Sequence, residues 1–307
     1  MSAAPGRPKQ ANTPSGVRPP YSADGGSNYG PAAWHQTQWD WRAAGNFICG
    51  GAGGGLILFA VASGAQGWSL ALLLLGGLAL VGTGLLCVWL EIGRPLRALH
   101  VFFNPRTSWM TREALVGALL IPVVLAVAVG FGPLGWLAAL LALAFVYCQA
   151  RIVRGATGIP AWREPLVVPL LVLTGLAEGG GWWLAVQPGS AAAQPLLLGL
   201  VGGLLLARGL VWLGYRGRLN RTAAPRALAA LDAVGGWLQY AGAAAPLLLL
   251  ALVTGGVASG ALAQTLLVIA GVLVAATGAA FKFTLITRAG FNQGFALAHL
   301  PMRGVRR

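Results

Sequence analysis

The feature that most constrains this chain is a series of eight apolar stretches, each near the length of a membrane span. They cover roughly 43–63, 68–90, 114–130, 134–151, 165–186, 195–215, 235–254 and 260–286. About 20 apolar residues in an α-helix match the hydrocarbon core of a bilayer. Only 9% of the residues are charged, against about 25% in a soluble domain. The sequence therefore predicts an all-α integral membrane protein with eight transmembrane helices, for which two four-helix bundles are one arrangement.

The first of these stretches is unusually rich in glycine. It contains Gly50-Gly51-Ala52-Gly53-Gly54-Gly55, which includes two overlapping G-x-x-x-G pairs. Small residues at this spacing allow either close contact between helices or the approach of a flat ligand. We favour helix contact, because it is the usual role of such pairs in membrane proteins.

The connections between the apolar stretches alternate sharply in charge. Apart from Arg208 and Lys282, the 21 Lys and Arg residues lie in or next to one alternate set of segments. That set comprises the N-terminal tail, 91–113, 152–164, 216–234 and the C-terminal tail. The other set comprises 64–67, 130–133, 187–195 and the turn near Thr254, and it contains no charged residue.

This alternation predicts the orientation of the chain. Basic residues concentrate in the cytoplasmic loops of membrane proteins, so both termini are expected in the cytoplasm. We expect a disordered cytoplasmic tail over 1–38, a transmembrane domain over 39–290 and a cytoplasmic C-terminal tail over 291–307. The chain is thus predicted to be a multi-pass protein of the inner (cytoplasmic) membrane, with the lipid bilayer around its helices.

Composition also argues against several classes of function. The net charge of +14 lies in short loops and tails with no soluble basic domain, so no nucleic-acid partner is expected. The three cysteines stand alone in apolar stretches without a C-x-x-C pair, so no metal site and no iron–sulfur cluster is expected in this chain. No haem is expected either, because all three histidines (His35, His100 and His299) lie in tails or loops. Electrons, if the protein handles them, would need a diffusible carrier.

Glu178, Arg208 and Lys282 are charged residues that fall within predicted spans. Glu178 lies about 20 Å along its helix from the cytoplasmic side, and Arg208 lies about 10 Å from the cytoplasmic end of the next. Direct pairing would require Arg208 to extend towards the bilayer centre. Such groups are functional candidates by default, so a role in proton movement stands beside a structural ion pair or a water-filled pocket. Lys282 lies near a helix end and is expected to snorkel to the surface.

The segment from Glu91 to Glu113, EIGRPLRALHVFFNPRTSWMTRE, carries the densest chemistry, with four arginines, two glutamates and a histidine. We expect Thr111 to cap the third span, with Glu113 in its first turn. In the structural interpretation, Glu113 stabilises the positive helix N-terminus and the arginines contact lipid phosphates. In the functional interpretation, Glu91 and Glu113 exchange protons with a bound quinone, and the arginines steady its anionic form.

This segment resembles the loop between the second and third helices in the membrane-anchor family of dimethyl sulfoxide reductases, which are molybdopterin oxidoreductases. The matching residues are Gly93, Arg94, Pro95, Arg97, Ala98, Asn104, Ser108, Trp109, Arg112 and Glu113. Shorter similar segments are Trp39-Asp40-Trp41, Asn46-Phe47, Ile159-Pro160-Ala161-Trp162 and Asn292-Gln293-Gly294-Phe295. The eight-span layout is also similar.

The resemblance implies a function and partners. Members of this family hold a molybdopterin catalytic subunit and an iron–sulfur subunit at the membrane, exchange electrons with ubiquinone or menaquinone, and carry no haem. By resemblance, Glu113 and Glu91 would exchange protons with the quinone. The residues implied in quinone binding or partner docking are Arg94, Pro95, Arg97, Asn104, Trp109 and Arg112. Some members have a histidine where this chain has Glu91. The cytoplasmic position of the loop is similar to that in the anchor subunits of phenylacetyl-CoA:acceptor oxidoreductases.

Two other classes compete with this interpretation. A secondary transporter could use a midplane site formed by Glu178 and Arg208, but it predicts broken helices in corresponding positions of two similar halves. The sequence shows no such pair. A membrane enzyme acting on a lipid would need a convergent catalytic set such as histidines within the spans, and none is present.

Overall fold

The computed structural model of the chain describes residues 33–91 and 100–294. Its long helices are α1 (Trp41–Ala62), α2 (Gly67–Glu91), α3 (Trp109–Ala128), α4 (Gly135–Gly155), α6 (Val167–Val186), α8 (Pro195–Leu219), α9 (Pro225–Gln239), α10 (Ala245–Thr254) and α11 (Gly260–Thr287). Shorter elements are the 3-10 helix η2 (Gly132–Leu134), α5 (Pro160–Arg163), α7 (Pro188–Ala192) and the π-helical segment η3 (Tyr240–Ala244). η2 continues into α4, and η3 joins α9 to α10. The described residues therefore contain eight helical passes that are long and apolar enough to cross a membrane. The all-α, multi-pass prediction is confirmed.

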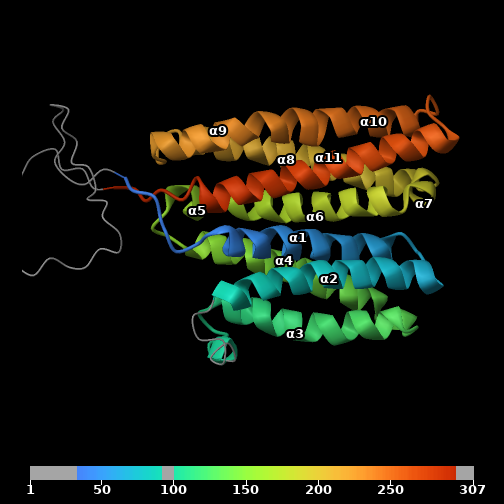
Figure 1. Cartoon of the computed structure of the whole chain (residues 1–307), viewed down its shortest axis with the longest axis horizontal. Helices are drawn as coiled ribbons and strands as arrows, with labels where there is room; N and C mark the ends of the chain where they lie inside the picture. The colour runs from blue at the N-terminus through green and yellow to red at the C-terminus, as the bar shows by residue number, and fades with distance from the viewer. Residues whose placement is uncertain (1–32, 92–99, 295–307) are drawn as a thin grey trace, which may run out of the picture. The chain divides into compact units, whose positions relative to one another are not determined.

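The eight passes form two groups of four. In the first group α1 packs against α2 and α4, and α3 packs against α4 and α2. In the second group α6 packs against α8 and α11, and α10 packs against α11 and α8. Figure 1 shows α1, α6 and α11 running side by side through the middle, where α1 contacts both of the others and joins the two groups. The Glu178–Lys282 pair described below lies at this junction.

Close packing at the junction depends on glycine. A Cβ atom at Gly55 of α1 would collide with the backbone oxygen of Gly175 on α6, and one at Gly179 would collide with the backbone of Gly55. The Gly51–Gly55 pair of α1 therefore meets Gly175 and Gly179, which have the same spacing on α6, and this is how small residues bring two membrane helices into contact. The expectation of helix contact is confirmed for Gly55.

We predict that Gly179→Ala weakens this contact. The added methyl group has no space against the α1 backbone, so the helices must separate, at a cost of about 1–3 kcal/mol in the free energy of unfolding. Gly203→Ala on α8 is the matched control, because nothing lies within 4 Å of its Cβ position and alanine favours a helix by up to about 1 kcal/mol. Unfolding titrations in detergent measure both. Equal stability of the two variants would contradict the packing role.

Two local predictions are wrong. The residue that caps α3 is Ser108, whose side-chain oxygen accepts from the Thr111 backbone N–H at 3.2 Å, so Thr111 lies inside the helix and Glu113 lies beyond its first turn. The predicted loop over 216–234 is mostly helical. Pro225 is favoured in the first turn of α9, and the 2.6 Å ion pair between Arg216 and Asp232 joins the end of α8 to the middle of α9.

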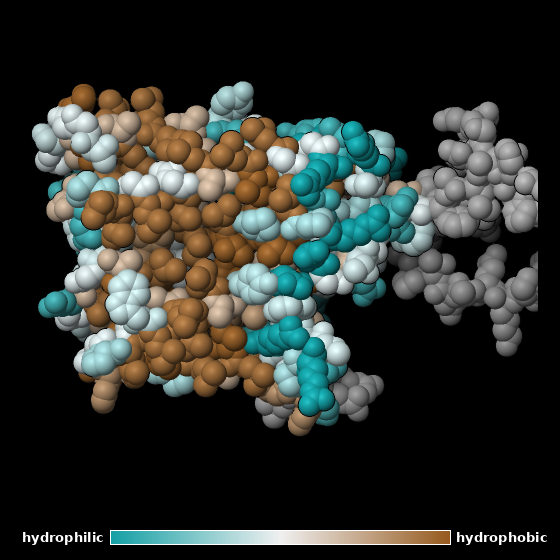
Figure 2. All heavy atoms as spheres, turned by 180° about the vertical axis from the view of Figure 1, so that it is seen from behind, coloured by the Kyte–Doolittle hydropathy of each residue, from teal (hydrophilic) through white to brown (hydrophobic). Residues whose placement is uncertain are grey.

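Charge separates the two ends of the helices. The starts of α1, α3, α6 and α9 and the ends of α2, α4, α8 and α11 form what we call the charged end. Connections at the opposite, uncharged end (63–66, 129–134, 187–194 and 255–259) contain no Asp, Glu, Lys or Arg. Figure 2 shows hydrophilic side chains gathered at one end and a hydrophobic band across the middle. The charged and uncharged ends of the helices therefore correspond to the alternating charged and uncharged connections along the sequence.

At the charged end, residues just before α1 contact residues just after α11. The backbone N–H of Gln36 donates to Gly290 O at 2.8 Å, and His35 and Phe291 form an isolated β-bridge. Most of both predicted tails (1–32 and 295–307) lies outside the described residues. The compact helical unit spans His35–Gln293, close to the range of 39–290 expected for the transmembrane domain.

Candidate functional site

Glu113 lies in a buried polar cluster with Asn46 of α1 and Gln149 of α4. Each of the three residues is at most 7% exposed, and both side-chain amides lie next to the Glu113 carboxyl. Gln149 Nε2 also donates to the backbone oxygen of Asn46 at 3.1 Å. Oε1 of Glu113 has no hydrogen-bond partner within the described part of the chain. An unsatisfied buried carboxyl oxygen destabilises the fold by about 1–3 kcal/mol, so it marks a candidate for function.

Trp109 lies one turn before Glu113 on α3, between two arginines. The guanidinium carbon of Arg112 is 4.1 Å from the ring centre, and that of Arg151 on α4 is 4.2 Å from it. Arg151 also donates to the Tyr147 hydroxyl at 2.7 Å. Cation–π contacts of this kind stabilise a guanidinium over the face of a tryptophan. Trp109 and Arg112, both implied in docking or quinone binding, are therefore held in one stack beside the Glu113 cluster.

Arg112 also organises the loop before α3. It donates to the backbone oxygens of Pro105 at 2.9 Å and Arg106 at 2.7 Å, while Asn104 O accepts from the Ser108 N–H at 3.1 Å. The loop from Asn104 to Ser108 is thus tied to the start of the helix. The remaining loop candidates (Arg94, Pro95 and Arg97) lie outside the described residues.

Glu91 belongs to a different cluster. It ends α2 and interacts electrostatically with Asp40 and Arg42, which lie at the start of α1. Arg42 pairs with Asp40 at 2.8 Å and donates to Leu90 O at 2.9 Å. The hydrogen bond from Arg42 holds the pKa of Asp40 below its usual value. The structure therefore brings Glu113 together with Trp109 and Arg112, and places Glu91 in a separate cluster.

Glu178 forms a buried ion pair with Lys282, across the contact between α6 and α11. Glu178 Oε2 lies 2.6 Å from Lys282 Nζ, and the two side chains are only 1% and 2% exposed. Lys282 Nζ also donates to Phe47 O on α1 at 2.9 Å. The expectation that Lys282 snorkels is wrong, because α11 extends more than one turn beyond it. Gly51 on α1 makes room for the ammonium group, since a Cβ atom there would collide with Nζ.

Arg208 has a different partner from the one considered in the sequence. It is fully buried, and its Nη2 donates to Gly242 O at 2.5 Å. Gly242 lies in η3, where a π-helical turn changes the backbone hydrogen-bond pattern. Its lack of a side chain is required, because a Cβ atom would collide with Thr277 Oγ1. Arg208 Nε and Nη1 have no hydrogen-bond partner among residues 33–91 and 100–294.

Sequence reasoning missed the roles of Asn46, Gln149 and Lys282. Asn46 and Gln149 are amides close to the ends of apolar stretches, and each could have been noted as a buried polar group in need of a partner. Nothing local in the sequence indicates which helix face carries Lys282. Its role as the partner of Glu178 appears only when α6 and α11 are packed together.

No protein-family model matches the chain, and a comparison with curated proteins finds no match. The resemblance of the loop therefore depends on its motif residues alone. The fold and the sites define a class of protein, which is a multi-pass α-helical membrane protein with ionisable groups buried between its helices.

Proposed function

We propose that this chain is the membrane-anchor and quinone-interacting subunit of a molybdopterin/iron–sulfur oxidoreductase. It passes electrons between an iron–sulfur cluster of a partner subunit and the quinone pool. The observation that carries the proposal is the environment of Glu113. The last residues of the family-like motif (Trp109, Arg112 and Glu113) form one group, in which the carboxyl is buried and one of its oxygens has no hydrogen-bond partner among the described residues.

The chemistry of a quinone requires such a group. Reduction to a quinol takes up two electrons and two protons, and oxidation releases them. A partner cluster supplies or accepts the electrons, and Glu113 exchanges protons with the quinone. Glu113 lies about 7 Å along α3 from the charged end, which is close enough to exchange protons with water through a short path. The amides of Asn46 and Gln149 hold the carboxyl in place.

The charged end is the proposed docking face. The exposed Arg106 and the half-buried Arg112 lie beside the Glu113 cluster and suit an acidic surface on the iron–sulfur subunit. The excess of basic residues favours a cytoplasmic position for this end, with both termini in the cytoplasm and a cytoplasmic catalytic partner. That side is the one implied by the resemblance to phenylacetyl-CoA:acceptor oxidoreductase anchors.

Purification from its own membranes tests this function. A tagged full chain extracted in mild detergent is expected to bring with it an iron–sulfur subunit and a molybdopterin subunit, with quinone-linked turnover in the complex. Arg106→Glu should weaken the association, whereas Trp136→Ala, an exposed residue near the uncharged end, should not. A chain that is active without any iron–sulfur partner would overturn the proposal.

A secondary transporter is the second candidate, favoured by the deeply buried charges and by the π-helical interruption in the pass formed by α9 and α10. The corresponding pass in the first group, α3, contains Pro122 but remains α-helical. The halves therefore do not share an interruption, which favours the anchor. Uptake of a solute by the isolated chain in proteoliposomes would support the transporter instead.

A further inference from the structure

Two buried polar side chains approach the same turn of α1 from different helices. Gln149 of α4 donates to Asn46 O at 3.1 Å, and Lys282 of α11 donates to Phe47 O at 2.9 Å. The two oxygens belong to successive residues of α1. The two donors also lie at a similar depth, about 9 Å along α4 and about 8 Å along α11 from the charged end. This turn of α1 therefore lies between the Glu113 cluster and the Glu178–Lys282 pair.

A small cavity lies beside this turn of α1, and both Gln149 and Lys282 line it. Its volume of about 10 Å³ is room for about one water molecule. Every residue that lines it is buried, including Lys282 at 1% and Gln149 at 3% exposed. Gly50 and Gly51 of α1 leave the space for these two side chains, since a Cβ atom at Gly50 would collide with Gln149 Nε2 and one at Gly51 with Lys282 Nζ. The cavity is thus a buried site bordered by two polar groups.

Both polar side chains have hydrogen-bonding capacity that the described residues leave unused. The Lys282 nitrogen has three hydrogen-bonding positions besides its bond to Cε, and Phe47 O and Glu178 Oε2 take two of them. The third position is a donor when the amine is protonated and an acceptor when it is neutral. Oε1 of Gln149 accepts no hydrogen bond from any described residue. A water molecule suits either state of Lys282, because water both donates and accepts, and it can donate to Oε1.

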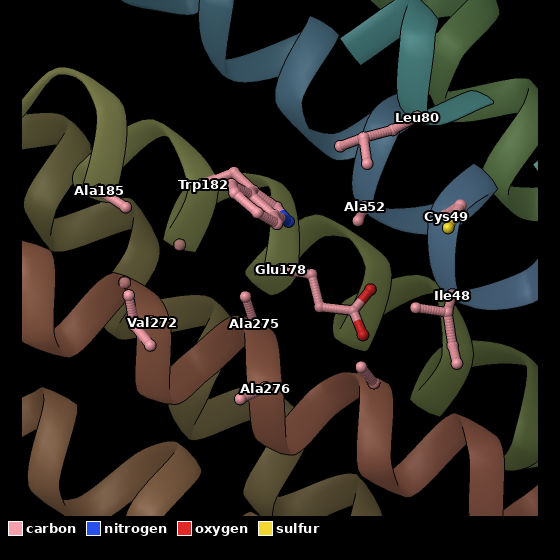
Figure 3. A pocket seen from close by; sticks show the side chains of 13 residues that line it. Ile48, Cys49, Ala52, Leu80, Glu178, Trp182, Ala185, Val272, Ala275 and Ala276 are labelled. Atoms are coloured by element: carbon pink, nitrogen blue, oxygen red, sulfur yellow. The ribbon is translucent and has the colours of Figure 1, made fainter. Parts of the chain in front are cut away.

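A larger pocket of about 330 Å³ adjoins Glu178 between α1, α2, α6 and α11, as Figure 3 shows. Its wall is apolar, and Glu178 Oε1 is packed against Gly278, where a Cβ atom would collide with it. α1 presents Ala52 to this pocket and Gly51 to the small cavity. Polar contacts of the ion pair therefore continue towards the small cavity and not towards the larger pocket.

We infer that the small cavity binds one water molecule, which bridges Gln149 Oε1 and Lys282 Nζ. A buried water typically makes two to four hydrogen bonds to polar groups that otherwise lack a partner, and the cavity offers two such groups. The water joins the Glu113 cluster to the Glu178–Lys282 pair. One polar network then crosses the junction between the two groups of four helices. This inference concerns the chain by itself and goes beyond the proposed function.

The network couples the two clusters and does not carry protons between them. The side-chain amide of Gln149 has no ionisable group, so it interrupts any proton transfer from Glu113 to Lys282. Hydrogen bonds in a chain polarise one another, and electrostatic interactions are stronger in the low dielectric of the interior. A change at one end of the network therefore alters the free energy of the groups at the other end.

A structure of the full chain at a resolution that shows ordered water tests the site directly. We expect one water peak in the cavity, within hydrogen-bonding distance of Gln149 Oε1 and Lys282 Nζ. Ala150→Val adds two methyl groups at the lining and should remove the peak. Ala139→Val, at a buried alanine of α4 away from the lining, is the matched control and should keep it. A map of the unmodified chain that shows other buried waters but none in this cavity would overturn the inference.

A double-mutant cycle tests the coupling. Gln149→Met and Lys282→Met are made singly and together, and unfolding titrations in detergent give each equilibrium constant. The second change should cost less once the first has removed the bridge, so we expect non-additivity of about twofold or more in the equilibrium constant. This coupling should disappear when Ala150→Val is present and persist with Ala139→Val. Additive effects in the unmodified background would contradict the bridge.

The outcomes separate this inference from the proposed function. If Lys282→Met fails to fold, the water peak and its loss in Ala150→Val still decide whether the site exists. A bridging water in a chain that has no iron–sulfur partner supports the network and contradicts the anchor function. A dry cavity in a complex with normal quinone-linked turnover overturns the network and leaves the anchor function supported.

Discussion

Replacing Glu113 by Gln is expected to lower quinone-linked turnover of the assembled complex by at least about a hundredfold. A positioned proton donor or acceptor typically contributes 10²- to 10⁴-fold to a rate, and an amide cannot take that role at neutral pH. The shape of the side chain is preserved, and Oε1 has no hydrogen-bond partner among the described residues that the change would break. Assembly and stability should therefore change little.

The measurement compares turnover with assembly in the same preparation. Glu164→Gln is the matched control, because Glu164 lies at the same charged end in a 3.3 Å pair with Arg218 and has no contact with the Glu113 cluster in the described structure. An exposed pair of this kind contributes about 0–1 kcal/mol, so the control should assemble and turn over normally. Loss of assembly in Glu113→Gln, with normal turnover per assembled complex, would show that Glu113 is a structural residue of α3.

Breaking the Glu178–Lys282 pair has the second large expected effect, which is on stability. Removing one partner leaves a buried charge of the other, and such changes cost about 3–5 kcal/mol in the free energy of unfolding. Lys282→Met leaves the carboxylate, and Glu178→Met leaves an ammonium group whose remaining bond is to Phe47 O. The double variant removes both charges and should be more stable than either single variant.

A double-mutant cycle from unfolding titrations in detergent measures this coupling. The matched control is Asp232→Asn, which breaks the exposed Arg216–Asp232 pair at the charged end and should cost less than about 1 kcal/mol. Additive effects of Glu178→Met and Lys282→Met would mean that the two charges do not stabilise each other. In that case Glu178 would owe its burial to another partner.

Local patterns in the sequence predicted the passes well and their ends less well. The eight apolar stretches correspond to the eight passes because the length and apolarity of a span are local properties. Ser108 and Thr111 are both suitable helix caps, and only the structure shows that Ser108 accepts the bond. The segment over 216–234 has loop-like charge, yet most of it is helical, with Pro225 in the first turn of α9 and Arg216 paired with Asp232.

The residues of the candidate site were likewise predicted only in part from the sequence. Glu113, Trp109 and Arg112 could be identified from a short motif, since they are within five residues of one another on α3. Asn46 and Gln149 complete the cluster from two other helices, 103 residues apart in sequence. Their meeting depends on how α1, α3 and α4 are rotated against one another. No periodicity in the individual helices defines that rotation.

The sequence by itself determined the class of this protein, its number of passes and which ends of the helices are charged, because hydropathy and charge are properties of individual segments. Only the tertiary structure decided the partner of Glu178. Arg208 lies nearer in the sequence, but Lys282, 104 residues away, forms the pair. The physical reason is packing: Gly51 leaves space for the ammonium group between α1, α6 and α11, while Gly242 O in the π-helical turn accepts from Arg208.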